Sequence, residues 1–266
     1  MTFEDFEYDG MTLSDMGYIV CDFNGSNGFK NVTLGSVLTF NKIKVNQGKK
    51  YLLASSQYDE CIEDKFQICK NPCNKSDMPL TDEDIRQLMR WLNRREFLPF
   101  TIISDDFQNI HFEATFNIEK IVFGDEVYGL ELSFLTNSPF AYADVHEYTF
   151  DTTNNPIYEI YDSSDEIGDT DLEAYVTCLT NGDLIITNRF DGSETIVRNC
   201  ISGETIHFKD MLISTDDPYH EHTIMNDFNW VFPQIKNTYR ERLNVYEFSI
   251  PCEVTFSYSP IIKVGV

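Results

Sequence analysis

The sequence lacks any uninterrupted apolar run close to the roughly 20 residues that a membrane-spanning helix needs, although 42% of its 266 residues are hydrophobic. It also lacks a secretory signal at its start, MTFEDFEYDG, which is acidic and has no apolar centre. We therefore expect a soluble protein that is made in a cytoplasm and has no membrane partner. We expect its seven cysteines to be reduced thiols.

Positive charge is scarce. The chain has 20 basic and 44 acidic residues, a formal charge of −24, which divides into −11 up to Phe150 and −13 after it. Neither half has the basic patch that attracts phosphate, so we expect no stable nucleic-acid binding. The acidity favours solubility; if the protein lines a channel, it also makes a wall along which DNA slides without adhering.

Catalytic motifs are missing as well. The sequence has no G-x-S-x-G elbow, no phosphate-binding glycine loop and no H-E-x-x-H helix. Its five histidines leave few partners for a triad, and among 44 acidic residues no spacing singles out a carboxylate pair for glycoside hydrolysis. We expect a protein that is not an enzyme and has no catalytic, cofactor-binding or metal-binding residues.

Two groups of residues are candidate metal sites. Cys61, Cys69 and Cys73 are separated by seven and then three residues, whereas structural zinc sites usually bring two close ligand pairs, so ordinary thiols are favoured. His220 and His222 alternate and could hold a cation on a loop, but a plain surface loop is the favoured interpretation. Their acidic neighbours are Asp216, Asp217 and Glu221.

Three aromatic residues are candidates for a sugar-stacking platform: Trp230, Tyr219 and Tyr239. Exposed aromatic rings can stack on sugars, and such a surface would make the second half of the chain a carbohydrate-binding module. In strands and around prolines, however, aromatic residues usually belong to the core. The core interpretation is therefore favoured.

The first half predicts one helix and an antiparallel meander. Thr81 can cap a helix, Arg94 and Arg95 suit its end, and the acidic residues 82–84 suit its first turn. Its apolar stripe is Ile85, Leu88, Met89 and Leu92. The strands follow in FLPFTIIS, IHFEATFNIEKIVFG and VYGLELSFLT. In the middle strand the inward series Phe112, Ala114, Phe116 and Ile118 continues with Ile121 and Phe123, a change of phase that predicts a bulge.

The second half predicts a β-sandwich. Short strands at nearly regular spacing are separated by Asn-Gly, Asp-Gly and Ser-Gly turns. We place the boundary near residues 143–145, with an N-terminal domain over 1–145 and a second domain over 146–266, and read the acidic run 162–171 as a solvated linker. One phase of alternation runs from Tyr246 to Tyr258, where Pro251 predicts an edge, a bulge or the join of two strands.

Several segments, in this order, resemble the distal tail proteins (Dit) of long-tailed bacteriophages. They are FEYDGMTLSDMGYIV (6–20), DIRQLMRWLNRREFLPF (84–100), LSFLTNSPFAYAD (132–144), NGDLIITN (181–188), SGETIHFKD (202–210), NDFNWVFPQI (226–235) and CEVTFSYSPIIKVGV (252–266). The resemblance covers most of the chain. Residues 236–239 lack the glycine expected in a tight turn of the family, and here the sequence departs from the family pattern.

The resemblance implies a mainly β fold with a β-sandwich-like, ring-forming first domain that holds one helix, and a peripheral galectin-like sandwich. It implies a homo-hexameric ring in the virion tail tip that binds the tail tube protein, a tail-associated hub protein and, in some phages, receptor-binding proteins. Six chains at −24 each carry −144, which suits a lumen for DNA. A carbohydrate-binding module and a hub protein of a contractile tail-like particle stay open as alternatives.

Overall fold

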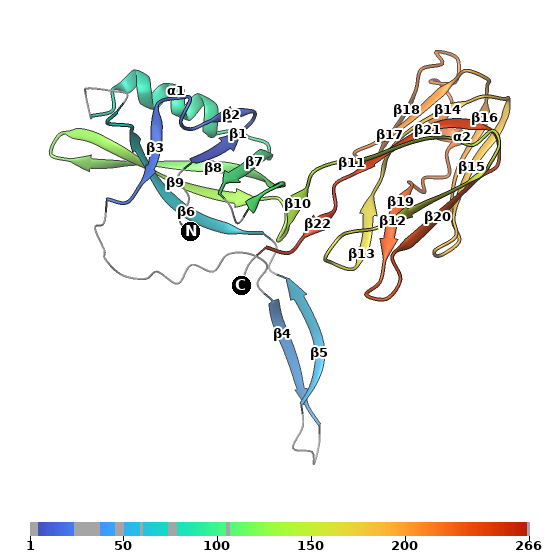
Figure 1. Ribbon diagram of the computed structural model, residues 1–266, viewed down its shortest axis with the longest axis horizontal. Helices are drawn as coiled ribbons and strands as arrows, with labels where there is room; N and C mark the ends of the chain where they lie inside the picture. Colours follow the sequence, from blue (N-terminus) through green and yellow to red (C-terminus); the bar gives the residue numbers. More distant parts are fainter. Residues whose placement is uncertain are drawn as a thin grey trace. The chain divides into compact units, whose positions relative to one another are not determined.

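The computed structural model describes residues 5–23, 38–45, 51–58, 61–73, 79–104 and 107–264. These residues are mostly in β-strands (Figure 1). The chain forms two compact units, Met1–Ala143 with Ile262–Val266, and Asp144–Ile261. Each unit has its own hydrophobic core. The expected mainly β fold is therefore confirmed.

A large antiparallel sheet forms the first unit. Its main path runs β2-β1-β7-β8-β9-β6-β3, and β10 pairs with β8 and β22. The strands are β1 (Asp5–Tyr8), β2 (Met11–Thr12), β3 (Tyr18–Cys21), β6 (Glu63–Lys70), β7 (Leu98–Ile103), β8 (Ile110–Phe123), β9 (Glu126–Thr136), β10 (Ala141–Ala143) and β22 (Ile261–Ile262). The three predicted strands of the meander are β7, β8 and β9.

The longest helix of the described residues, α1 (Asp82–Leu92), packs on this sheet (Figure 1). Thr81 caps it as predicted, in a reciprocal capping box with Asp84. The predicted stripe is wrong at one position, because Met89 is 47% exposed and Trp91 is buried instead. Trp91 reaches inward because its ring stacks on Phe6 and its Nε1 donates a hydrogen bond to the carbonyl oxygen of Tyr8, at 2.9 Å.

The predicted bulge lies between β8 and β9, but the extra residue is on β9. Ile121 pairs with Gly129 and Val122 with Val127, so Tyr128 has no residue opposite it. Beyond this point the hairpin has left the core, and Phe123 is 80% exposed. Its assignment to the inward face was therefore wrong.

The second unit is a β-sandwich, as predicted. One sheet has the order β11-β21-β14-β17-β18 and the other β12-β20-β15-β16. Its elements are β11 (His146–Asp151), β12 (Ile157–Tyr161), β13 (Gly168–Asp171), β14 (Glu173–Cys178), β15 (Gly182–Asn188), β16 (Ser193–Cys200), β17 (Thr205–Lys209), β18 (Leu212–Thr215), α2 (Ile224–Asp227), β19 (Gln234–Asn237), β20 (Leu243–Phe248) and β21 (Cys252–Tyr258). Pro251 lies at the join of β20 and β21, one of its three predicted places.

The acidic run 162–171 is not a solvated linker. It contains β13, which pairs with β19, and it begins with Asp162, whose side chain is fully buried. The Asp162 carboxylate accepts hydrogen bonds from Ser164 Oγ, at 2.8 Å, and from Asn237 Nδ2. These donors replace water, so the carboxylate can lie inside the protein.

The end of the chain returns to the first unit, although the sequence assigned it to the second domain. Tyr142 and Ala143 of β10 pair with β8, and β22 extends this ladder beyond β10. Val264 is only 7% exposed and belongs to the first hydrophobic core. Burial of Val264 in this core holds the short C-terminal segment against the first unit.

Candidate functional site

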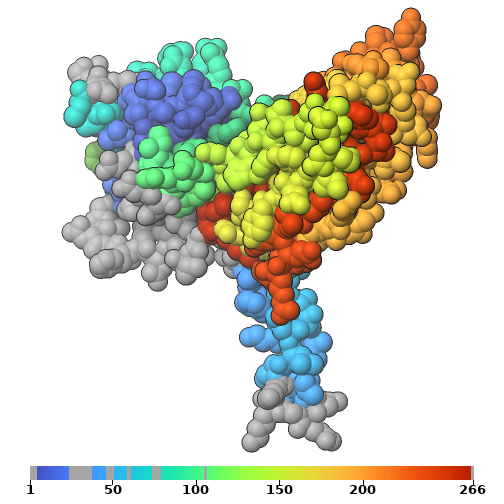
Figure 2. Space-filling view, turned by 45° about the vertical axis from the view of Figure 1, so that its right-hand side comes forward, coloured from blue at the N-terminus to red at the C-terminus, as the bar shows by residue number. Residues whose placement is uncertain are grey.

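A two-stranded hairpin of the first unit carries six exposed large apolar side chains, those of Leu38, Phe40, Ile43, Tyr51, Leu52 and Leu53. Its strands, β4 (Leu38–Lys44) and β5 (Tyr51–Tyr58), pair with each other and with no other described strand (Figure 1). Every residue of β4 and all of β5 except Tyr58 are exposed (Figure 2). An isolated hairpin is at best marginally stable in water. We therefore infer that these two strands pack against the surface of a partner.

The strand register places apolar side chains on both faces of this hairpin. Phe40 and Leu53 lie on one face, and Ile43 and Leu52 pair across the other. These four side chains are between 51% and 62% exposed. Soluble proteins seldom leave such a cluster in water unless it meets a partner. The hairpin is therefore a candidate assembly surface.

The base of the hairpin is anchored within the first unit. The ring of Tyr58 meets that of Phe140 edge to face, with centroids 4.8 Å apart. The ammonium group of Lys263 lies 5.5 Å from the Tyr58 ring centroid, within the range of a cation–π interaction. These contacts hold Tyr58, which ends β5 and pairs with Leu38 at the start of β4, while the apolar side chains further along the two strands remain exposed.

The charge of this segment is opposite to that of the rest of the chain. Residues 23–58 contain five of the 20 basic residues and none of the 44 acidic ones. The remaining sequence, with 15 basic and 44 acidic residues, has a formal charge of −29. Our reading of the sequence missed the hairpin, yet this acid-free run in an acidic chain was the signal that could have revealed it.

The three aromatic candidates do not form the predicted core. Tyr219, Trp230 and Tyr239 are 89%, 59% and 68% exposed. Trp230 adopts a positive φ of 63° and its ring contacts Phe228. Among the described ring contacts, none joins two of the three candidates. Their exposure was wrongly predicted, and the structure gives no shared platform.

The three cysteine candidates do not come together either. All seven cysteines are free in the structure. Cys69 is buried and Cys73 is exposed, and the described residues show no metal-ligand group that includes Cys61, Cys69 or Cys73. Burial and the neighbouring Cys69 thiol raise the pKa of Cys21 above its ordinary value.

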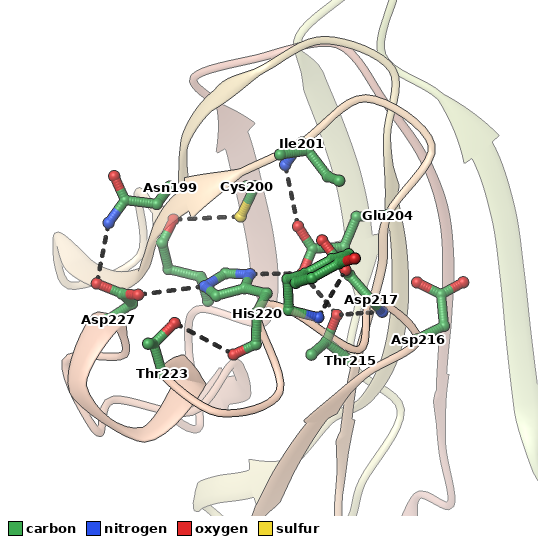
Figure 3. A network of polar contacts seen from close by, with 12 residues as sticks. Asn199, Cys200, Ile201, Glu204, Thr215, Asp216, Asp217, His220, Thr223 and Asp227 are labelled. Atoms are coloured by element: carbon green, nitrogen blue, oxygen red, sulfur yellow. Dashed lines mark hydrogen bonds and ion pairs between the residues drawn. The ribbon is translucent and has the colours of Figure 1, made fainter.

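His220 is not on the surface, contrary to the favoured interpretation. It is 6% exposed, whereas His222 is exposed. The His220 ring lies between two carboxylates: its Nδ1 is 2.5 Å from Glu204 Oε1 and its Nε2 is 3.4 Å from Asp227 Oδ2 (Figure 3). The predicted neighbours Asp216, Asp217 and Glu221 are not the residues that face it.

Cys200 completes a buried polar cluster with Glu204 and His220. One potential ligand atom from each lies within 4.8 Å of the other two, and all three residues are buried. The adjacent Cys178 thiol, and burial, hold the pKa of the Cys200 thiol well above its ordinary value. Sequence reasoning missed Cys200, Glu204 and Asp227 because they come from separate segments that only the folded sandwich brings together.

Comparison with known proteins identifies the class. Residues 1–138 match a phage tail protein N-terminal domain, and residues 140–258 match a phage tail C-terminal domain. Two such domains in succession define a structural protein of a phage tail. The chain belongs to the phage tail protein family that these domains describe. No helix of its described residues has the length and apolar character to cross a membrane.

A solved structure shares the fold. The chain is similar to the Dit protein (gp 19.1) of SPP1, described as a paradigm of the hub adsorption apparatus in phages that infect Gram-positive bacteria. The TM-score is 0.62 at 14% identity, covering 97% of this chain and 99% of that chain. No curated protein sequence matches the chain. The fold expected from the distal tail protein resemblance is confirmed.

Proposed function

We propose that this chain is a non-enzymatic hub subunit that closes into a ring of six copies at the tail tip. The first unit forms the ring, and the sandwich lies at its periphery. The ring joins the tail tube protein to a tail-associated hub protein, carries receptor-binding proteins at its edge and lets DNA pass. The exposed apolar hairpin β4–β5 is the observation that carries this proposal.

The occupant of the hairpin's surface is a second copy of the same chain. Its exposed apolar side chains call for a partner surface, and its lysines favour an acidic one. The rest of each copy is strongly acidic. A hairpin that docks on a different surface of the next copy makes a head-to-tail contact, and such contacts close into rings when the rotation between copies allows it.

The net charge fits a DNA channel. Six copies at −24 each carry −144, and a lumen of that sign repels phosphate and limits adhesion. Docking of the lysine-bearing hairpins on neighbouring copies also removes part of the positive charge from solvent. This separation of charge supports passage of DNA without binding.

Light scattering after gel filtration, together with negative-stain images, tests the ring. The full chain should run at about six times its 30.9 kDa mass. The double substitution Phe40→Ser with Leu53→Ser should give smaller species, because it removes two exposed apolar side chains from one hairpin face. Asn41→Ser with Gln57→Ser is the matched control and should leave the ring intact.

Two results would contradict the proposal in different ways. A full chain that stays monomeric up to high concentration, in the absence and presence of the tube protein, excludes the ring. A ring that persists in the Phe40→Ser, Leu53→Ser variant excludes the hairpin as the element that closes it. Circular dichroism of each variant shows that the fold is retained.

A further inference from the structure

The sandwich contains a buried donor set that ring assembly does not use. Cys200 is the last residue of β16, Glu204 precedes β17, and His220 lies between β18 and α2. Their thiol, carboxylate and imidazole are the three kinds of side chain that bind zinc. The three residues are between 2% and 6% exposed, so water does not solvate these groups.

The residues around His220 are placed to orient it as a metal ligand. A histidine that ligates through one ring nitrogen usually donates the other N–H to a carboxylate. Here Nδ1 faces Glu204, while the buried Nε2 makes no hydrogen bond and lies 3.4 Å from Asp227 Oδ2 (Figure 3). Asn199 holds the other oxygen of Asp227 at 3.0 Å.

A small shift of the His220 ring would satisfy both sides at once. Nδ1 and Glu204 Oε1 are 2.5 Å apart, whereas two ligands of a tetrahedral zinc ion with bonds of about 2.0 Å lie roughly 3.3 Å apart. Moving the ring away from Glu204 by less than about 1 Å opens that separation and brings Nε2 toward Asp227. The backbone N–H of Ile201 keeps the second oxygen of Glu204 in place, at 3.0 Å.

We propose that Cys200, Glu204 and His220 bind one Zn²⁺-type ion inside the sandwich, with a water molecule as the fourth ligand. The Cys200 thiol proton and the proton shared by Glu204 and His220 leave as the three bonds to the metal form. The ion joins the end of β16, the turn before β17 and the loop before α2. It acts as a structural brace for this edge of the sandwich.

Cobalt substitution combined with metal analysis tests the proposal on the full chain. After chelation and gel filtration, the protein reloaded with zinc should retain about one ion per chain. With Co²⁺ it should show the thiolate charge-transfer band and the intense visible bands of a tetrahedral site. Zinc should raise the Tm of the sandwich by several degrees.

Variants separate this site from the other thiols. Cys200→Ser should abolish the charge-transfer band and weaken metal binding at least tenfold, and His220→Gln should weaken it similarly. Cys252→Ser, at an equally buried thiol, and Cys73→Ser, at an exposed thiol, are matched controls and should leave the band unchanged. Circular dichroism confirms that each variant is folded.

A wild-type chain that retains no zinc and shows no cobalt–thiolate band would overturn the proposal and leave a buried His–Glu ion pair. A band that survives in Cys200→Ser, or disappears in Cys73→Ser, would place the metal elsewhere and overturn it too. None of these readouts depends on ring formation, so these experiments test the metal site independently of the hub function.

Discussion

Lys70 places its ammonium nitrogen 2.7 Å from Asp84 Oδ2, with both side chains largely withdrawn from water. Asp84 is also the N3 residue of the capping box of α1 and accepts hydrogen bonds from Thr81. Burial opposes ionisation of the Asp84 carboxyl, but the hydrogen bonds from Lys70 and Thr81 outweigh it and hold its pKa well below the usual range. One carboxylate therefore joins the start of the helix to β6.

Asp84→Asn should lower the free energy of unfolding of the first unit by about 2–3 kcal/mol at pH 7, because it leaves Lys70 without its charged partner. The depressed pKa stabilises the fold above the unfolded-state pKa of about 3.9, and this contribution disappears as the pH falls through the lowered value. The difference between wild type and variant should thus shrink in acid. Asp82→Asn, an exposed first-turn substitution, is the control.

Fluorescence can follow each unit by itself, because the chain has two tryptophans, Trp91 in the first unit and Trp230 in the second. Trp230 is 59% exposed, so Trp230→Phe should leave stability nearly unchanged and make Trp91 the only reporter. Urea unfolding in this background measures the first unit. A constant difference between wild type and Asp84→Asn from pH 7 into acid would contradict the assigned role of the carboxylate.

Gly129 should not tolerate a side chain. A Cβ there would lie 2.6 Å from the Ile68 carbonyl oxygen on the neighbouring strand β6 and 2.4 Å from the Phe23 ring. The ring can move, but the backbone carbonyl cannot without disturbing the ladder between β6 and β9. Gly129→Ala should therefore lower the first unit's free energy of unfolding by about 1–3 kcal/mol. Denaturant unfolding followed by Trp91 fluorescence measures this free energy. An unchanged value would show that the β6 backbone at Ile68 can move aside at little cost.

Apolar periodicity predicted the meander, the strands of the sandwich and the helix α1, because it is a local property of the chain. Ile85, Leu88 and Leu92 follow the helical period and are buried as expected. Trp91 lies off the predicted stripe, and its burial depends on Phe6 and Tyr8, which are more than 80 residues away. Contacts between residues so far apart in the sequence cannot be predicted from local apolar periodicity.

The buried polar clusters escaped prediction for a related reason. Asp162 lies in an acidic run, and composition alone makes such a run look solvated. Its burial depends on Asn237, which arrives from β19. His220 likewise meets Glu204 and Asp227 only in the folded sandwich. The partner residues, and not the charged residues themselves, decide whether these groups can leave water.

Asp162→Ala should destabilise the second unit by about 2–4 kcal/mol, because the buried Ser164 hydroxyl and Asn237 amide lose their acceptor. Glu253→Ala, at an exposed position of β21, should change stability by less than about 0.5 kcal/mol. Calorimetry that resolves the transitions of the two units measures both. If the two substitutions had equal effects, the hydrogen bonds of the Asp162 carboxylate would not stabilise the second unit.

The return of the chain to the first unit gives the sharpest test of how the two units are divided. Val264 is buried in the first core, Ile262 packs against that core, and β22 pairs with β10. Deleting residues 262–266 removes this burial and pairing from the first unit, although these residues follow the last strand of the second. In the Trp230→Phe background, unfolding followed by Trp91 should show the first unit destabilised by about 2–4 kcal/mol.

The second unit should unfold as before, which calorimetry of the same deletion can show. A fragment covering 144–261 should then fold by itself with a single cooperative transition, whereas 1–143 should be less stable than the same fragment joined by a short linker to 262–266. If the deletion instead lowers the stability of the sandwich and leaves the Trp91 transition unchanged, the terminal segment belongs to the second unit, and the division at residues 145 and 146 expected from the sequence holds.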